Sequence, residues 1–151
     1  MHIRPILSAA LLLVAPALAA VAAPAAPAAA CVSMEEGWIR MPPAPRPMLA
    51  GFGRITNRCG SEQAVVTVRS PRFGGVSLHE TRMVEGVSRM REVERLPVAA
   101  EGEAVLQPGG LHLMLMQPAS ALSEGERVPL VLVLADGREV PSVLTVRKTA
   151  P

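Results

Sequence analysis

The sequence predicts an all-β protein: a single domain built as an antiparallel Greek-key sandwich or small barrel. Three observations support this prediction. Apolar residues recur at alternate positions in short runs, which is the period of a half-buried strand. Clusters of Gly, Pro, Asp and Ser separate these runs at regular intervals. No segment carries the apolar stripe of a helix over the length of a helix, so six to eight strands in two layers account best for the chain.

The predicted strands follow one another between turn signals. Seven strand-like runs lie at 64–68, 76–83, 87–93, 104–107, 111–116, 128–134 and 143–146, and two further plausible strand segments lie at 37–41 and 51–57. The turn residues between them gather at 71–75, 85–86, 101–102, 108–110, 123–125 and 136–137. A proline-rich segment at 42–47 is expected to be a stiff loop, because proline gives a strand ladder no N–H donor.

The N-terminal 22 residues are predicted to be a secretory signal peptide. Arg4 precedes an almost wholly apolar run at 6–18, and small-residue cleavage sites follow at 17–19 and 20–22. An uncleaved membrane anchor is the alternative, but the run is short, rich in alanine and broken by Pro16. We therefore expect an exported, periplasmic protein with no stable membrane insertion after cleavage.

The rest of the chain has two parts. Residues 23–30 are only Ala and Pro, so they are expected to form a tether. Residues 31–151 have the length of one small domain with one hydrophobic core. Their arginines are scattered along the sequence, and the chain has no Tyr, one Trp and two Phe to stack against bases. Nucleic acid is therefore not an expected partner.

The two cysteines, Cys31 and Cys59, are expected to form a disulfide, because export places an even number of cysteines in an oxidising compartment. Each lies near the outer end of a predicted strand. The bond would add about 3 kcal/mol to the stability in the chain-entropy model. Attachment of a lipid to Cys31, which follows three alanines, is the alternative.

Four residues form the pattern H-x10-M-x21-H-x-M: His79, Met90, His112 and Met114. Apart from His2 in the predicted leader, they include every histidine of the chain. Two imidazoles and two thioethers without a thiolate make a soft, neutral ligand set, which suits Cu(I) far better than Mg²⁺ or Ca²⁺. Thioethers also resist the oxidation to disulfide that would remove thiols in an exported protein.

Strand geometry is expected to bring the four residues together. A two-residue hairpin loop at 85–86 places His79 opposite Glu92, with Met90 as the diagonal neighbour of His79 on the same face. His112 and the methionine two residues later project from one face of a third strand. Met90 and His112 should lie at the surface end of the sheet.

Structural roles for the same residue types are the alternative. A single histidine is more often a satisfied structural residue than a metal ligand, and a methionine in a strand usually fills the core. Met116 continues the face of His112, and Met83 continues the face of His79. Both of these methionines are assigned to core or rim packing rather than to metal binding.

The sequence around these residues resembles the PCu(A)C family of exported bacterial copper chaperones. The resemblance is carried by Leu-His-Glu-Thr at 78–81, Gly-Val-Ser-Arg-Met-Arg at 86–91 and the run Leu-Gln-Pro-Gly-Gly-Leu-His-Leu-Met-Leu-Met at 106–116. It implies a cupredoxin-like sandwich that binds one Cu(I) through the residues that stand here at His79, Met90, His112 and Met114. It also implies delivery to a copper-accepting protein, either the subunit of cytochrome oxidase that holds the dinuclear copper centre or a thioredoxin-like Sco-type thiol protein.

The chain departs from the family pattern in two places. Glu80 follows the first motif histidine, where many members have Met; the predicted ladder puts Glu80 on the opposite face, so it is not counted as a ligand. Many members carry a His- and Met-rich tail that could hold a second copper. This sequence ends in Arg147-Lys148-Thr149-Ala150-Pro151, so a second site is not expected.

Several classes of function remain open from the sequence. A Cu(I) chaperone that works by ligand exchange is the leading hypothesis, with copper storage or tolerance as an alternative. A blue-copper electron carrier needs a Cys thiolate beside its histidines, and no cysteine lies between His79 and Met114. An adhesion or ligand-binding sandwich with an incidental His/Met cluster is the third hypothesis. An enzyme is not expected, since the sequence has no nucleophile elbow.

Overall fold

The computed structural model describes residues 31–151, and this part of the chain contains ten strands and no helix. The strands are β1 (Val32–Arg40), β2 (Met48–Asn57), β3 (Gln63–Arg69), β4 (Phe73–Val84), β5 (Val87–Glu92), β6 (Leu96–Val98), β7 (Glu103–Leu106), β8 (Leu111–Pro118), β9 (Arg127–Leu134) and β10 (Glu139–Arg147). The predicted signal peptide and tether, residues 1–22 and 23–30, lie outside the described residues. Within 31–151 there is no helix of the length and apolarity that crossing a membrane requires.

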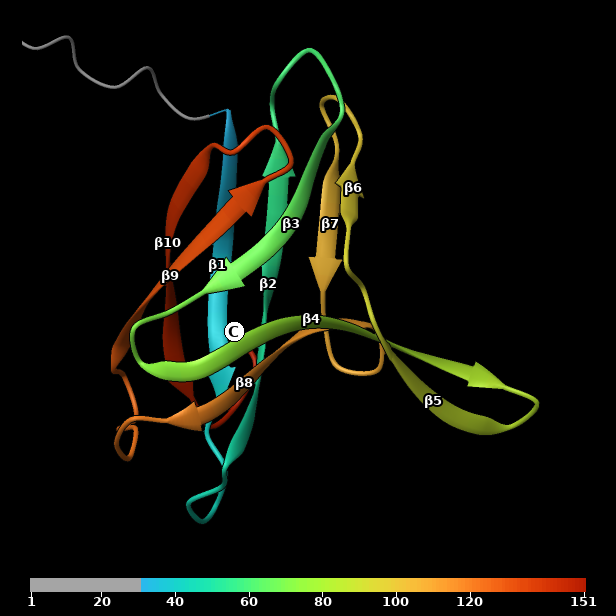
Figure 1. The fold of residues 1–151 in the computed structure, drawn as a ribbon. Coiled ribbons are helices and arrows are strands. Elements are labelled where there is room, and N and C mark those ends of the chain that lie inside the picture. Colours follow the sequence, from blue (N-terminus) through green and yellow to red (C-terminus); the bar gives the residue numbers. More distant parts are fainter. Residues whose placement is uncertain (1–30) are drawn as a thin grey trace, which may run out of the picture.

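The strands form one sheet that curls on itself. Its order is β5-β4-β8-β7-β2-β1-β10-β9-β3-β6, with a further pairing between β8 and β2. β3 and β4 are not hydrogen-bonded neighbours, yet they lie side by side, so two layers face each other (Figure 1). Buried apolar side chains fill the space between the layers. The prediction of an all-β sandwich is confirmed. Most pairings are antiparallel, and two of them, β1 with β10 and β7 with β8, are parallel.

The hydrophobic core is built from the inward faces of these strands. In β8, Leu113 and Leu115 are wholly buried, and the residues between and beside them point to the other face. The other fully buried side chains are Ile39, Ile55, Leu130, Leu132, Leu134, Leu144, Val32, Val98, Val128 and Val146. Because alternate residues of β8 are fixed in this core, the intervening His112, Met114 and Met116 share the opposite face.

The β4–β5 hairpin leaves the body of the domain as an arm. β5 stands at the end of the sheet and pairs only with β4, and all six of its residues are exposed. Figure 1 shows the two strands running past the other elements to a free turn. The predicted two-residue turn is confirmed, since Val84 pairs with Val87 and His79 pairs with Glu92.

The structure has ten strands rather than the six to eight predicted, and three assignments differ most from the sequence prediction, each with a local cause. β6 was not predicted, because it is three residues long and contains Pro97; it is an edge strand, where proline is tolerated. β10 begins at Glu139, before the predicted start. Pro141 lies in this first part of the strand, where β10 pairs with β9 on one edge and β1 has not yet joined the other edge. β1 begins at Val32, and a register shift after Glu35 interrupts its alternation.

The predicted disulfide is present between Cys31 and Cys59. Their Cα atoms are 5.1 Å apart, and the bond joins the ends of β1 and β2, where Val32 pairs with Asn57. A bond over a sequence separation of 28 residues stabilises the fold by about 3 kcal/mol in the chain-entropy model. The sulfur that a lipid thioether would need at Cys31 is therefore occupied.

An ion pair joins the turn before β4 to the loop before β9. The Glu126 carboxylate accepts a hydrogen bond from the Ser123 backbone N–H at 3.0 Å, and it forms an ion pair with Arg72 at 2.7 Å. Both interactions favour the carboxylate, and the hydrogen bond from Ser123 is the main cause of the lowered pKa of Glu126. Because the pKa of Glu126 is lower in the folded protein than in the unfolded chain, the ionised carboxylate stabilises the fold at pH values above its unfolded-state pKa. This stabilisation is lost as pH falls through its folded-state pKa.

We expect Glu126→Gln to be less stable than the wild type at pH 7. The difference should shrink as pH falls below about 4.3, the ordinary pKa of a glutamate, because the unfolded wild-type chain is protonated there first and the folded carboxylate follows at its lowered pKa. Urea unfolding at pH 7, 5 and 3 measures this difference. Glu124→Gln, which changes the same charge at an exposed position, serves as the control. An equal loss of stability for Glu126→Gln at all three pH values would contradict the prediction.

Candidate metal centre

Two histidines stand directly opposite each other on neighbouring strands. His79 of β4 pairs with His112 of β8, and their ring centroids are 6.0 Å apart with the ring planes tilted by 32°. Directly opposed residues of an antiparallel pair project from the same face, so both imidazoles point to one side of the sheet. This register joins strands that are far apart in the sequence.

The His112 ring is held in one orientation by its own strand. Its Nδ1 lies 2.9 Å from the carbonyl oxygen of Gly110. A carbonyl only accepts hydrogen bonds, so Nδ1 carries the proton and Nε2 keeps a free lone pair. The turn before β8 supplies this carbonyl, with Gly109 at φ 81° in the left-handed region that glycine favours. His112 thus offers Nε2 as a donor atom for a metal.

The His79 ring is half-buried and has a neighbouring hydroxyl. Its Nε2 lies 2.9 Å from Ser77 Oγ. Ser77 stands two residues before His79 on the same face, as Gly110 stands two residues before His112. The hydroxyl can donate to Nε2 while the ring has no metal, and it can rotate away when Nε2 binds one.

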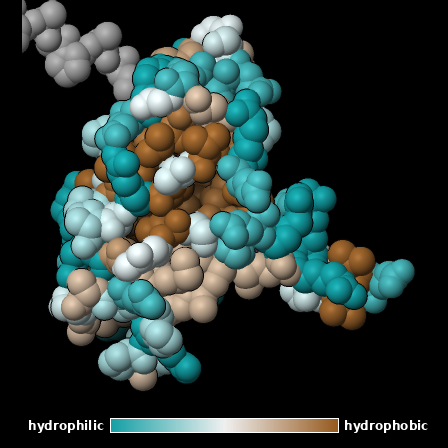
Figure 2. All heavy atoms as spheres, in the orientation of Figure 1, coloured by the Kyte–Doolittle hydropathy of each residue, from teal (hydrophilic) through white to brown (hydrophobic). Residues whose placement is uncertain are grey.

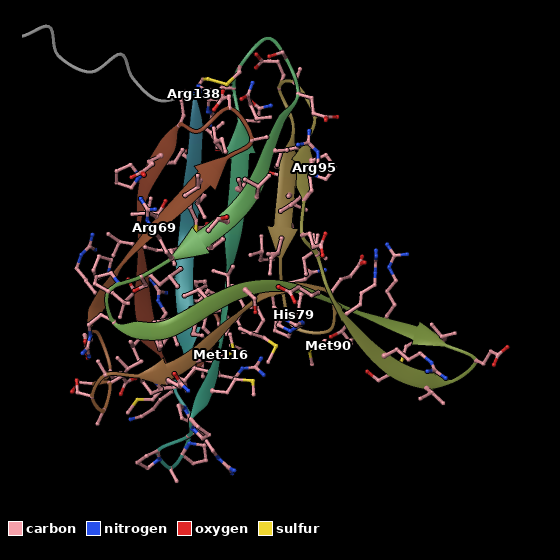
Figure 3. The ribbon with its side chains drawn as sticks, viewed as in Figure 1. Arg69, His79, Met90, Arg95, Met116 and Arg138 are labelled. Carbon is pink, nitrogen blue, oxygen red and sulfur yellow. A yellow bond between two sulfur atoms is a disulfide. The ribbon has the colours of Figure 1, made fainter. Side chains whose placement is uncertain are left out.

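The two motif methionines flank the histidine pair on the same face. Met114 is half-buried and pairs with Ser77 on one side and Ala50 on the other. Met90 pairs with Thr81, one step along the arm from the histidines, and is 55% exposed. Figure 3 places Met90 beside His79, where the arm leaves the body of the domain.

One sequence-based expectation about these residues is wrong. His112 was expected at the surface end of the sheet, but it is only 8% exposed. The strands on both sides of β8 shield it, because β8 is an inner strand between β4 and the β7–β2 region. Met90 is at the surface as expected, because it lies on the arm.

Other methionines lie on or beside the same face. Met116 pairs with Met48 of β2 and is half-buried, in agreement with a packing role at the rim. Met83 was also assigned to packing, but it is 68% exposed near the end of the arm. The arm has no second layer against which Met83 could pack.

Glu80 faces away from the histidines. Its carboxylate accepts hydrogen bonds from Arg91 at 2.9 and 3.2 Å and forms an ion pair with Arg82 at 2.8 Å. The pKa of Glu80 is lowered, mainly by the hydrogen bond from Arg82. The carboxylate is therefore engaged by arginines on the opposite side of β4, which agrees with leaving Glu80 out of the ligand set.

The cysteines are remote from the histidine pair. The disulfide lies beside Arg138, at the other end of the domain from His79 (Figure 3). Both cysteines of the chain are in this bond, so neither offers a thiolate to a metal. Among residues 31–151, no three His, Cys, Asp or Glu side chains form a metal-binding group.

The chain also matches a known protein family. The profile of the family described as "Putative lipoprotein LpqE-like" matches residues 32–146. The chain belongs to this LpqE-like family, which is of the PCu(A)C type. The LpqE-like chain is 30% identical over 119 residues to a protein of Leifsonia xyli subsp. xyli that is named "Putative lipoprotein", with 77% of this chain and 69% of that protein covered.

Solved structures also match the LpqE-like chain. The solution structure of apo-DR1885 from Deinococcus radiodurans is 28% identical, with a TM-score of 0.63 over 95% of this chain and 97% of that one. The CuI form of the same protein is 28% identical, with a TM-score of 0.64 over 78% and 79% of the two chains. The apo PCuAC domain of PmoF1 shares the fold at 20% identity, with a TM-score of 0.65 over 81% and 96%.

Sequence reasoning missed the groups that orient the two imidazoles. Ser77 and Gly110 each stand two residues before a motif histidine of the LpqE-like chain, and both contact the ring that follows them. The spacing i−2 puts the Ser77 side chain on the face of His79, so this contact could be predicted from the sequence. The Gly110 carbonyl lies in the turn before β8, where strand alternation gives no such signal. The role of these neighbours becomes clear only when His79 and His112 are considered as a pair.

Proposed function

We propose that this protein is an exported Cu(I) chaperone. It binds one Cu(I) through His79, Met90, His112 and Met114 and passes the ion by ligand exchange to a copper-accepting protein. Two imidazoles and two thioethers suit a soft monovalent ion. The acceptor of this proposal is the copper subunit of cytochrome oxidase or a Sco-type thiol protein, in the periplasm.

The observation that carries the proposal is the facing pair of imidazoles beside Met114. His112 presents Nε2 because its Nδ1 is bound to a backbone carbonyl, and His79 stands opposite it on the next strand. The CuI form of DR1885, which has this fold and is 28% identical, supports copper as the ion. Relatives named as lipoproteins support export.

The ligand set also accounts for transfer. A thioether is a weaker donor to Cu(I) than a thiolate, so an acceptor with thiolates can draw the ion away. The two imidazoles give the site enough affinity to hold Cu(I) until that acceptor arrives. The chain itself needs to supply no chemistry beyond this exchange of ligands.

Competition against a chromophoric Cu(I) chelator tests the proposal. Uptake of one equivalent of Cu(I) by the purified protein is the expected result. No stoichiometric uptake would favour an adhesion or ligand-binding sandwich. An intense visible thiolate band after loading with Cu(II) would favour an electron carrier instead.

Met90→Leu is expected to lower the Cu(I) affinity by about 10- to 100-fold, the range found even for residues that only support a metal ligand. Leucine removes the sulfur and keeps a similar apolar volume. The unfolding free energy should stay unchanged, because Met90 is 55% exposed on the arm. Chelator competition and urea unfolding measure the two quantities.

Met83→Leu is the matched control for this variant. Met83 stands on the same face of the same arm and is 68% exposed, but it lies outside the motif. Its replacement should leave the Cu(I) affinity as it is. Equal effects of the two substitutions would remove Met90 from the ligand set.

A further inference from the structure

The arm carries one face that is not directed to the candidate metal centre. The ladder of β4 and β5 pairs Glu80 with Arg91, Arg82 with Arg89, and Val84 with Val87. These six residues project from one side of the arm, and we call this side the arginine face. The candidate ligands His79 and Met90 belong to the other side. The sequence shows these arginines only as scattered, and the hairpin gathers three of them.

We propose that the arginine face is a docking surface for an acidic surface of the protein that accepts the copper. This inference rests on the proposed function for the identity of the partner. Its electrostatic part rests on the structure alone. Three observations support it: an excess of positive charge, exposed apolar residues within the same face, and the position of the arm next to the candidate metal centre.

The positive charge on this face exceeds what the fold itself compensates. Three guanidinium groups stand against one carboxylate, and that carboxylate, Glu80, already pairs with both Arg82 and Arg91. Arg89 lies directly opposite Arg82, and like charges directly opposite in a ladder destabilise it. Within residues 31–151, no acidic side chain forms an ion pair with Arg89. An acidic partner supplies the missing counter-charge.

The same face exposes apolar side chains at the end of the arm. Val84 is 43% exposed and Val87 is 55% exposed, next to the arginine pair. Figure 2 shows apolar residues at the surface of the arm among polar ones. Exposed apolar side chains beside arginines are typical of protein interfaces, where Arg is enriched and Lys is depleted.

The arm also places a docked protein near the metal. β5 is one of the two edge strands of the sheet, and the arm is only one sheet thick. A protein bound to the arginine face therefore reaches Met90 around the edge of β5. Glu85 in the turn and Glu92 on the opposite face are acidic, but neither belongs to the arginine face.

Peptide titrations of the copper-free protein test the electrostatic part. Hexaglutamate is expected to shift the backbone amide NMR signals of residues 80–91 at low salt, and hexalysine is not. At about 0.5 M salt the shifts should disappear, because exposed charges are screened. Equal shifts with both peptides, or shifts that lie outside the arm, would overturn the proposal.

Arg89→Glu should weaken hexaglutamate binding by at least about 5-fold, since it removes a charge and reverses it. The fold should be retained, because the new carboxylate faces Arg82 across the ladder. Arg95→Glu makes the same change of charge at a position that is 56% exposed and lies outside the arm, and it should bind as the wild type does. A wild-type affinity for Arg89→Glu would reject the arginine face.

Copper transfer tests the identity of the partner. A Cys-x-x-Cys peptide flanked by glutamates should take Cu(I) from the loaded protein at least about 10-fold faster than the same peptide flanked by lysines. Arg89→Glu should abolish this difference without changing the Cu(I) affinity. If hexaglutamate shifts the NMR signals of the arm but the protein does not bind Cu(I), the chaperone function is rejected and the docking surface stands. If the protein binds Cu(I) but hexaglutamate does not shift the signals of the arm, the docking surface is rejected and the chaperone function stands.

Discussion

Replacing His112 with alanine is expected to lower the Cu(I) affinity by about 100-fold or more, since it removes a ligand rather than a residue that supports one. It should also lower the free energy of unfolding by about 1–3 kcal/mol, because the ring is buried. The carbonyl of Gly110 keeps a partner in the variant, the N–H of Thr81 at 3.0 Å. The loss of stability is therefore moderate.

His79→Ala separates the two effects. His79 is half-buried, so its replacement should weaken Cu(I) binding as strongly as that of His112 but with a smaller loss of stability. Chelator competition gives the affinities, and urea unfolding of the copper-free proteins gives the stabilities. Unchanged affinity in both variants would reject the histidine pair as the centre.

Replacing both cysteines with serine is expected to lower the free energy of unfolding by about 3 kcal/mol and to leave the Cu(I) affinity unchanged. The bond restrains the ends of β1 and β2, whereas the histidine pair is held by β4 and β8 at the other end of the domain. The free energy of unfolding should therefore fall while the Cu(I) affinity stays the same.

The double replacement, Cys31→Ser with Cys59→Ser, avoids an unpaired thiol that could itself bind copper. Urea unfolding and chelator competition are again the measurements. A stability equal to that of the wild type would mean that the disulfide does not restrain the unfolded chain. A large fall in Cu(I) affinity would mean that sulfur from the cysteines takes part in the site.

The hairpin that carries His79 and Met90 could be predicted in detail. A two-residue turn leaves one register for the flanking strands, so the pairing of His79 with Glu92 followed from local sequence and is confirmed. The face shared by His112 and Met114 followed in the same way from the period of a strand. These predictions needed no contact between distant parts of the chain.

The pairing of β4 with β8 could not be predicted in register. It joins residues separated by a long stretch of sequence, and which residues stand opposite depends on the packing of core side chains such as Leu78 and Leu113. The direct opposition of the two histidines and the burial of His112 both depend on it. The short strand β6 was missed for a different reason, since its three residues carry too little pattern.

The arginine face was missed for a third reason. Arg82, Arg89 and Arg91 lie on two strands, and charge alone gives no reason to group them. The register of the hairpin groups them, and it was available from the sequence. The sequence does not show the isolation of the arm, because no pattern in β5 or in the end of β4 says that the body of the domain leaves both faces of this part open.

The isolation of the arm has a consequence for how an ion would leave. Of the four candidate ligands, Met90 alone is attached to a segment without a second layer of packing, while the other three are mounted on strands that hold the core. Bending the arm would withdraw one sulfur and open a coordination position, with the rest of the molecule at rest. Release would then begin from a three-coordinate ion whose vacant corner an incoming sulfur can fill. The stiffness of the arm beyond Thr81, whose N–H is bonded to the Gly110 carbonyl, would set the pace of exchange.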